Sequence, residues 1–235
     1  MAERYEHRAI LLGSGDPESG GGGSTVATLL QASAVGILPV EFVGIVCNNS
    51  EQKVPGFYEK IEDHNEQYGA DIPIYTINGA RYQATDGEIV EKGEQHAAEA
   101  QACIDVMDNH GADFYVAAGW MKKISGALLD RNGLNTHPGP LYPEGGMPEG
   151  LLPGIEGVDT KGLHGVHVQE VVLENGFPYS AHTSHEVIEE YDSGRIIGWR
   201  PVLVKPNDTP DTLFERVQIA EKAGLIEDIL KFALM

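Results

Sequence analysis

The chain has 235 residues, of which 41% are hydrophobic and 22% charged, and its formal net charge is −20. This length suits one α/β domain, and the composition is that of a soluble globular protein. The acidic balance argues against nucleic-acid binding, because neutralising phosphates requires a basic surface.

The first residues are polar and lead directly into a short apolar segment, so we expect no signal peptide. No apolar run is long enough to cross a bilayer, so we expect a cytoplasmic location and no membrane partner. Cys47 and Cys103 are the two cysteines, too few for a disulfide framework or a cysteine zinc site. We expect both to be buried as small apolar residues.

The first half of the chain predicts strands that alternate with helices. The predicted strands are residues 9–12, Val40–Cys47, 72–77 and 113–118, and the predicted helices are Ser24–Ala34 and 88–110. This alternation favours a parallel sheet with helices on both faces.

The second half has a different pattern. Residues 162–174 predict a helix, and residues 179–189 and 195–204 predict two extended segments joined by a turn at 192–194. Residues 209–234 predict a long C-terminal helix, with Thr209 or Asp211 as its cap. We therefore expect a Rossmann-like α/β fold, with a mostly parallel sheet that ends in an antiparallel hairpin and a long C-terminal helix.

A glycine run at residues 20–23 precedes Ser24 and Thr25, between the first predicted strand and helix. Unpaired N–H groups and the macrodipole make a helix N-terminus suitable for an anion, and glycine lets a phosphate approach. The run lacks the lysine of the nucleotide-binding P-loop and the spacing of a dinucleotide fingerprint. We predict a phosphate site at Gly23, Ser24 and Thr25; the alternative is a flexible surface linker.

Asn135 and His137 are two residues apart in a segment predicted to be extended, so both side chains leave the same face. The amide can donate to a developing oxyanion, and a protonated imidazole can add charge or move a proton. A carboxylate such as Asp192 would raise the pKa of that imidazole and orient it. The alternative is that residues 135–140 form only a turn.

Four histidines raise the alternative of a metal hydrolase. His164 and His167 are three apart on a predicted helix, and His182 and His185 lie near Asp192 in the sequence. Because an odd separation on a strand places His182 and His185 on opposite faces, we predict no metal site. We expect His185 to support the loop that carries Asp192.

Segments in a common order resemble the folate-dependent formyltransferases, and among them the phosphoribosylglycinamide formyltransferases of purine biosynthesis. These segments are residues 43–49, 118–125, 134–138, 162–165, 184–185 with Asp192 seven residues later, 208–213 and 215–221. The resemblance implies the same Rossmann-like fold, as one domain over residues 1–235. It implies a nucleotide- or phosphate-binding half at 1–133 and a catalytic and folate-binding half at 134–235.

The resemblance also assigns site residues. It implies that Asn135, His137 and Asp192 are catalytic, and that Gly23, Ser24 and Thr25 form the phosphate loop. Gln218 and Glu221 would bind the phosphate and ribosyl parts of the substrate, with Lys222 as a substitute for a lysine expected at 218. The implied folate-binding residues are Met121, Lys122, Lys123, Ile124, Ile188, Glu189, Glu190 and Tyr191.

The implied reaction moves a formyl group from the co-substrate 10-formyltetrahydrofolate to the amine of glycinamide ribonucleotide, without a metal, in a monomer or homodimer. Residues 142–161 form a segment rich in glycine and proline, which we interpret as a lid or as recognising another acceptor. The alternatives are a formyltetrahydrofolate hydrolase, a formyltransferase for another amine, and a catalytically inactive nucleotide-binding module.

Overall fold

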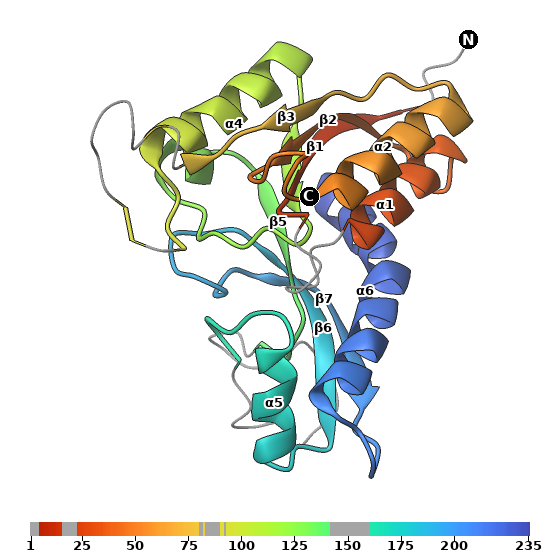
Figure 1. The fold of residues 1–235 in the computed structure, drawn as a ribbon, viewed down its shortest axis with the longest axis vertical. Coiled ribbons are helices and arrows are strands. Elements are labelled where there is room, and N and C mark those ends of the chain that lie inside the picture. The colour runs from red at the N-terminus through yellow and green to blue at the C-terminus, as the bar shows by residue number, and fades with distance from the viewer. Residues whose placement is uncertain (1–4, 16–22, 80–81, 83–89, 92, 142–159) are drawn as a thin grey trace. The chain divides into compact units, whose positions relative to one another are not determined.

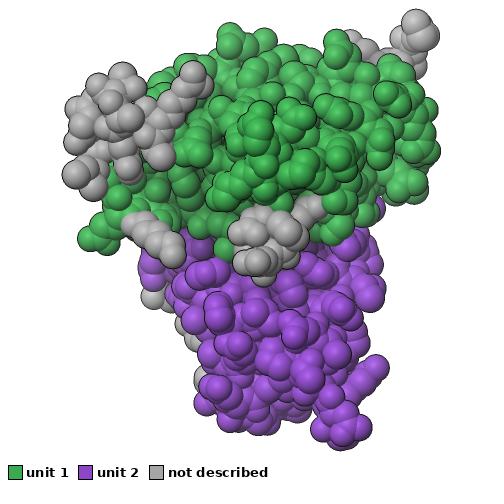
Figure 2. Space-filling view, in the orientation of Figure 1, with its two compact units in different colours: residues 1–134 green, residues 135–235 purple. Residues whose placement is uncertain are grey.

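A computed structural model describes residues 5–15, 23–79, 82, 90–91, 93–141 and 160–235. The chain divides into two compact units, residues 1–134 and residues 135–235 (Figure 2). The boundary falls inside a strand, β5 (Gly133–His137), close to the position at which the two predicted halves meet. That the halves form one domain stays a prediction.

The first unit contains parallel strands in the order β3-β2-β1-β4. They are β1 (His7–Gly13), β2 (Val40–Cys47), β3 (Ile74–Thr76) and β4 (Phe114–Ala117). The last five residues of β1 and all of β4 are buried, as expected of near-continuous apolar runs in a parallel sheet covered on both faces. Strand β1 is longer and β3 shorter than the sequence predicted.

Helices lie on both sides of these strands (Figure 1). Helices α1 (Ser24–Ala34) and α2 (Pro55–Tyr68) contact each other on one side, and α4 (Ala97–His110) packs against β1 and β2 from the other. A short 3-10 helix, η1 (Gly126–Asp130), contacts α4. The predicted layering of the first half is therefore confirmed.

Helix α2 is an element that the sequence analysis missed. Pro55 stands in its first turn, and Phe57, Tyr58, Ile61 and His64 are buried at helical spacing. The rest of the helix is mostly charged or polar, which left only a narrow apolar stripe. Burial of that stripe against the unit stabilises a helix whose own hydrophobic signal is weak.

The predicted start of the helix at residue 88 was wrong. Helix α4 begins at Ala97, and residues 90–91 and 93–96 are not helical. His96 Nδ1 accepts from Ala98 N at 3.1 Å, while the Glu99 side chain accepts from His96 N at 3.4 Å. This reciprocal cap satisfies N–H groups that an earlier start would have used inside the helix. Residues 88, 89 and 92 lie outside the described residues.

In the second unit, β5 is followed by α5 (His167–Glu174), β6 (Tyr179–Glu186), β7 (Ile196–Leu203) and α6 (Pro210–Ala233). Strands β6 and β7 pair antiparallel, from Tyr179 opposite Leu203 to His185 opposite Ile196. The predicted C-terminal hairpin and long helix are therefore confirmed, with β6 ending three residues earlier than predicted.

Helix α6 is capped by Thr209, whose hydroxyl accepts from Thr212 N at 3.3 Å. Asp211 instead lies in the first turn, where its negative charge suits the macrodipole. The predicted apolar face is buried at Leu213, Val217, Leu225, Ile229 and Phe232, whereas Ala220 is only half-buried. Part of this face packs with Val172 of α5 and Val202 of β7 in one core cluster.

Helix α5 begins at His167, whereas the sequence predicted a start at residue 162. Gly162 and Gly165 have φ values of +76° and +58°, so the chain turns in the left-handed region before the helix starts. His164 therefore precedes α5, and the prediction that it shares this helix with His167 was wrong.

No helix among the described residues is long and apolar enough to cross a membrane. In that same part of the chain, no group of three or more histidine, cysteine or acidic side chains is arranged to hold a metal ion. Cys47 and Cys103 are buried free thiols, as predicted.

Candidate active site

Asn135, His137 and Asp192 lie around one buried cluster in the second unit. His137 Nδ1 is 3.4 Å from Asp192 Oδ2. His185 joins them, because its Nε2 is 3.4 Å from Asp192 Oδ1 and accepts from Asn135 Nδ2 at 3.2 Å. His137, His185 and Asp192 are only 3%, 3% and 5% exposed, so their mutual interactions are weakly screened.

The turn after β6 directs the Asp192 carboxylate inward. Asp192 has a φ of +52°, which aspartate tolerates better than most residues. Gly162 N donates to its Oδ2 at 3.1 Å. A Cβ on Gly194 would come within 1.9 Å of the Glu186 carbonyl oxygen, so only glycine lets this turn close against the end of β6.

Hydrogen bonds to fixed partners define the tautomers of both imidazoles. Thr160 Oγ1 donates to Pro140 O at 2.8 Å, so it must accept from His137 Nε2, which lies 2.9 Å away. His185 Nδ1 donates to the Glu186 carbonyl oxygen at 2.8 Å. In their neutral forms, therefore, His137 Nδ1 and His185 Nε2 are the unprotonated nitrogens, and both face Asp192.

The cluster can accept one proton. Burial lowers the pKa of His137 to about 4, and the opposing effect of Asp192 does not compensate. Burial alone would raise the pKa of Asp192, but its interactions with His185 and His137 and the hydrogen bond from Gly162 N outweigh this effect and lower that pKa. Asp192 Oδ1 has no hydrogen-bond partner among the described residues.

The resting site therefore holds a carboxylate and a neutral His137 imidazole, and a protonated His137 during the reaction stays a prediction. The Asp192 carboxylate raises the pKa of His137, as predicted, but the desolvation of the buried imidazole lowers that pKa by more. A proton that enters between His137 and Asp192 would convert the pair into a buried imidazolium and carboxylate. This arrangement suits a group that takes up a proton during a reaction and then releases it.

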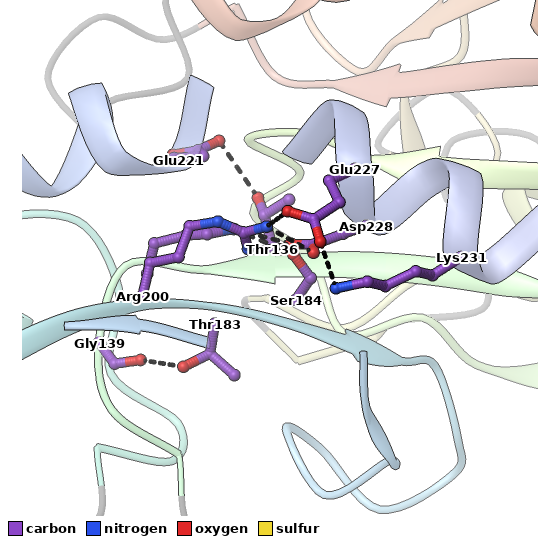
Figure 3. Close-up of polar contacts among 10 residues, drawn as sticks. Thr136, Gly139, Thr183, Ser184, Arg200, Glu221, Glu227, Asp228 and Lys231 are labelled. Atoms are coloured by element: carbon purple, nitrogen blue, oxygen red, sulfur yellow. Dashed lines mark hydrogen bonds and ion pairs between the residues drawn. The ribbon is translucent and has the colours of Figure 1, made fainter. Parts of the chain in front are cut away.

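Glu221 of α6 contacts Thr136, the residue of β5 that stands between Asn135 and His137. Thr136 Oγ1 donates to Glu221 Oε1 at 3.4 Å, and Figure 3 shows this contact between β5 and α6. Because side chains alternate along a strand, Thr136 and Glu221 lie on the face opposite to Asn135 and His137. Gln218 is half-buried three residues before Glu221, and Lys222 is half-buried beside it.

The loop predicted to close over the folate is largely exposed. Ile188, Glu189 and Glu190 are exposed, and Glu190 pairs with Lys161 at 3.6 Å. Tyr191 is half-buried, and burial raises its pKa to about 12. The loop thus presents an apolar side chain, Ile188, to solvent four residues before the buried Asp192.

The other predicted folate residues belong to the first unit. Ile124 is buried, and Met121, Lys122 and Lys123 are half-buried. The Lys122 ammonium lies 2.6 and 2.8 Å from the two oxygens of Glu99, a carboxylate with no exposed surface. This ion pair ties the segment to α4, so the charge of Lys122 is already compensated by Glu99.

The predicted phosphate loop also belongs to the first unit. Gly23 is the N-cap of α1, with φ +82° and no side-chain cap, and Ser24 and Thr25 form the first turn. A Cβ on Gly23 would lie 2.8 Å from the Phe57 ring, so space and φ both require glycine. The geometry is compatible with an anion at the helix N-terminus. Gly20, Gly21 and Gly22 lie outside the described residues.

The family model described as formyl transferase matches residues 19–229. The chain belongs to the formyl transferase family. Among solved structures, phosphoribosylglycinamide formyltransferase from Bacillus halodurans is similar, with a TM-score of 0.68 at 22% identity, over 97% of this chain and 94% of that one. This likeness confirms the predicted fold class.

Two curated relatives of this formyl transferase family member are informative. Phosphoribosylglycinamide formyltransferase from Mycobacterium tuberculosis strain H37Rv is 27% identical over 96% of this chain and 85% of the relative. The chloroplastic phosphoribosylglycinamide formyltransferase of Arabidopsis thaliana is 35% identical over 66% of this chain. The chain spans about half the length of its plant relatives, 46% of the Arabidopsis protein and 56% of the one from Vigna unguiculata.

The structure adds residues that sequence reasoning missed in this formyl transferase. Thr160 fixes the tautomer of His137, Gly162 binds the Asp192 carboxylate, and Glu99 binds Lys122. Thr160 lies at the end of the glycine- and proline-rich segment and Gly162 directly follows it, so both read as ordinary loop residues in the sequence. Residues 142–159 lie outside the described residues, so the predicted role of 142–161 as a lid stays a prediction.

A separate cavity of about 660 Å³ lies in the first unit. Its lining includes Tyr68 at the end of α2, Tyr75 of β3 and His110 at the end of α4. It contains none of the predicted site residues, and the converging polar groups described above are a stronger indication of chemistry than the size of this cavity.

Proposed function

We propose that this formyl transferase moves a formyl group from 10-formyltetrahydrofolate to the amine of glycinamide ribonucleotide, a step of purine biosynthesis. The names of the relatives support the choice of reaction. The observation that carries it is the meeting of Asn135, His137, His185 and Asp192 in one buried cluster with capacity for one proton. Formyl transfer to an amine requires an oxyanion donor together with a proton acceptor.

The first step is attack of the uncharged amine on the formyl carbon. A carbon–nitrogen bond forms, the carbonyl electrons move to oxygen, and the attacking nitrogen becomes positive. Asn135 Nδ2 already donates to His185 Nε2, which orients the amide, and its second N–H can donate to the oxyanion. A donor fixed before the reaction stabilises the transition state without the cost of reorganisation.

The second step moves the proton. It leaves the attacking amine and is held between Asp192 and an imidazole, where a positive imidazolium also stabilises the oxyanion. When the bond from the formyl carbon to the folate nitrogen breaks, that nitrogen receives the proton. The cluster thereby returns to its resting state, and no metal or covalent intermediate takes part.

Substrate binding completes the proposal. Gly23, Ser24 and Thr25 would bind the phosphate, while Gln218 and Glu221 would bind the phosphate and ribosyl groups, with Lys222 in reach of the same helix face. Met121, Lys122, Lys123, Ile124, Ile188, Glu189, Glu190 and Tyr191 would line the folate site. We also propose a cytoplasmic location, and a monomer or homodimer.

One assay tests the reaction. The protein is incubated with 10-formyltetrahydrofolate, with and without glycinamide ribonucleotide, and formylated amine, free folate and formate are quantified. We expect folate release that depends on the acceptor and equals the formylated amine. Formate release without acceptor would identify a hydrolase instead, and no turnover with or without glycinamide ribonucleotide would contradict the proposed reaction.

A further inference from the structure

A second polar network is buried in the same unit, between β6, β7 and α6. His182, Ser184 and Asp228 have no exposed surface. Ser184 Oγ donates to Asp228 Oδ2 at 2.7 Å, and His182 Nε2 donates to Ser184 Oγ at 2.9 Å. Figure 3 shows Asp228 of α6 directed at Ser184 of β6 and at Arg200 of β7.

Arg200 binds the Asp228 carboxylate through both terminal nitrogens. Nη1 lies 2.6 Å from Oδ2, and Nη2 lies 2.9 Å from Oδ1. Burial alone would raise the pKa of Asp228, but its interactions with His182, Arg200 and Ser184 lower it. The carboxylate is therefore ionised and held by a bidentate arginine, the most directional ion pair available to side chains.

The three residue types of a serine hydrolase meet here, but in an order that excludes nucleophilic catalysis. The hydroxyl donates its proton to the carboxylate, whereas a nucleophilic serine donates to the imidazole. Ser184 is also completely buried, so a substrate does not reach it. The role of this network must lie in structure.

Two glycines fit this network closely. A Cβ on Gly198 would come within 2.1 Å of both Asp228 carboxylate oxygens, and a Cβ on Gly224 would come within 1.9 Å of Arg200 Nε. Because Asp228 holds the guanidinium and Arg200 holds the carboxylate, neither can easily move aside. The position of α6 over β7 is thus fixed both by hydrogen bonds and by close contact.

This position affects the proposed active site through two connections. Ser184 is adjacent to His185, and the two side chains leave opposite faces of β6, one toward Asp228 and the other toward Asp192. Glu221, Gly224 and Asp228 are spaced by three and four residues, so they share one face of α6. Fixing Asp228 therefore fixes both the strand that carries His185 and the helix face that carries Glu221.

A gain in stability is a weak explanation for such a network. A buried ion pair loses much of its attraction to desolvation, and apolar residues of similar volume often serve a fold equally well. A bidentate pair flanked by two glycines instead specifies one geometry. The pairing of β6 with β7 shifts register between Ser184 and His185, so the strand needs a fixed point at this place.

We propose that Asp228, bound to Arg200 and Ser184, is a positioning residue that holds His185 in the catalytic cluster. This inference rests on the proposed function for its catalytic consequence. It predicts that breaking the Ser184 contact displaces His185 while the fold persists. A misplacement of about 1 Å can lower turnover by about 100-fold, so we expect a smaller displacement of His185 to lower it by about tenfold.

The experiment compares Asp228→Asn and Ser184→Ala with wild type. Asp228→Asn removes the charge, and Ser184→Ala removes the contact to β6 while leaving the ion pair intact, so the second variant remains informative if the first folds poorly. The matched control is Asp208→Asn, because Asp208 pairs with Arg216 at the other end of α6, away from His185. Imidazole ¹⁵N chemical shifts of His185 are recorded, together with kcat and KM for both substrates at a temperature where circular dichroism shows folded protein.

We expect the His185 shifts to change in Asp228→Asn and Ser184→Ala but not in Asp208→Asn. We expect kcat to fall by about tenfold in the same two variants, with KM values within about twofold of wild type. Unchanged His185 shifts and kcat in Ser184→Ala would overturn the inference, even if Asp228→Asn is impaired. If the wild type formylates no amine, the proposed function fails, and the His185 shifts alone decide whether the network positions this residue.

Discussion

His137 and Asp192 face each other in a buried site, with imidazole Nδ1 3.4 Å from carboxylate Oδ2. This separation is longer than a normal hydrogen bond, as expected when no proton lies between the two atoms. Thr160 keeps the ring proton on the opposite nitrogen, so the unprotonated nitrogen faces the carboxylate. The pair is therefore prepared to receive a proton.

Replacing the Asp192 carboxylate should remove the group that holds the transferred proton. We expect Asp192→Asn to lower kcat by about 100-fold or more, with KM values changed by less than a few fold, because general acid–base catalysis contributes roughly 10²–10⁴-fold. Steady-state kinetics would measure both parameters. Asp211→Asn, an exposed substitution in the first turn of α6, is the control. An Asp192→Asn enzyme with wild-type turnover would remove Asp192 from the mechanism.

The buried His137 should make stability depend on pH. Its pKa falls from 6.5 to about 4 on folding, so the unfolded chain binds a proton in this window that the folded protein does not. Its stabilising contribution is therefore present above pH 6.5 and is lost as the pH falls toward 4, by about 2 kcal/mol between pH 7 and pH 5. Urea denaturation would measure the loss, which should be smaller in His137→Gln. Equal losses in the two proteins would contradict a neutral buried His137.

The Lys122–Glu99 pair should respond unequally to loss of either partner. Glu99 has no exposed side-chain surface, whereas that of Lys122 is 20% exposed. We expect Lys122→Met to destabilise the first unit by about 3 kcal/mol, because it leaves a buried carboxylate unpaired. Glu99→Gln should cost less, since the lysine can turn toward water. Urea denaturation of both variants tests the order, and a larger cost for Glu99→Gln would refute this account.

Gly23 should matter for binding beyond its backbone conformation. We expect Gly23→Ala to destabilise the protein by about 2 kcal/mol, through φ +82° and contact with Phe57, and to raise the KM for the ribonucleotide. Gly69→Ala is the matched control, since Gly69 has φ +62° and nothing within 4 Å of an added Cβ. Gly69→Ala should be destabilised by backbone strain, without a change in the KM for the ribonucleotide. If both variants leave that KM unchanged, Gly23 is not part of a phosphate site.

Strand β2, helix α1 and the cap of α6 were predictable because their signals are local. Val40–Cys47 and Ser24–Ala34 match the structure residue for residue, since each is a continuous or periodic apolar run. The capping of α6 by Thr209 is also a local pattern. Helix α2 was missed because its charged residues leave a narrow apolar stripe, and α4 was extended too far because nothing in its periodicity reveals the cap at His96.

The candidate site was predictable in its residues but not in its electrostatics. Alternation along a strand places Asn135 and His137 on one face, and the resemblance supplied Asp192. The neutral state of His137 depends on its burial, and its tautomer depends on Thr160, a hydroxyl 23 residues away in the sequence. Similarly, Asp228 resembles an ordinary helical acid until the fold brings Arg200 and Ser184 to it. Such long-range contacts leave no periodic signal in the sequence.

Following the formyl carbon itself tests the central claim most directly. With 10-formyltetrahydrofolate labelled with ¹³C at the formyl group and with glycinamide ribonucleotide as acceptor, ¹³C NMR distinguishes the formylated amine from free formate. We predict that the label passes to the amine with wild-type protein, and at least 100-fold more slowly with Asp192→Asn. Label that appears as formate, or that stays on the folate in the presence of this acceptor, would contradict the proposed function.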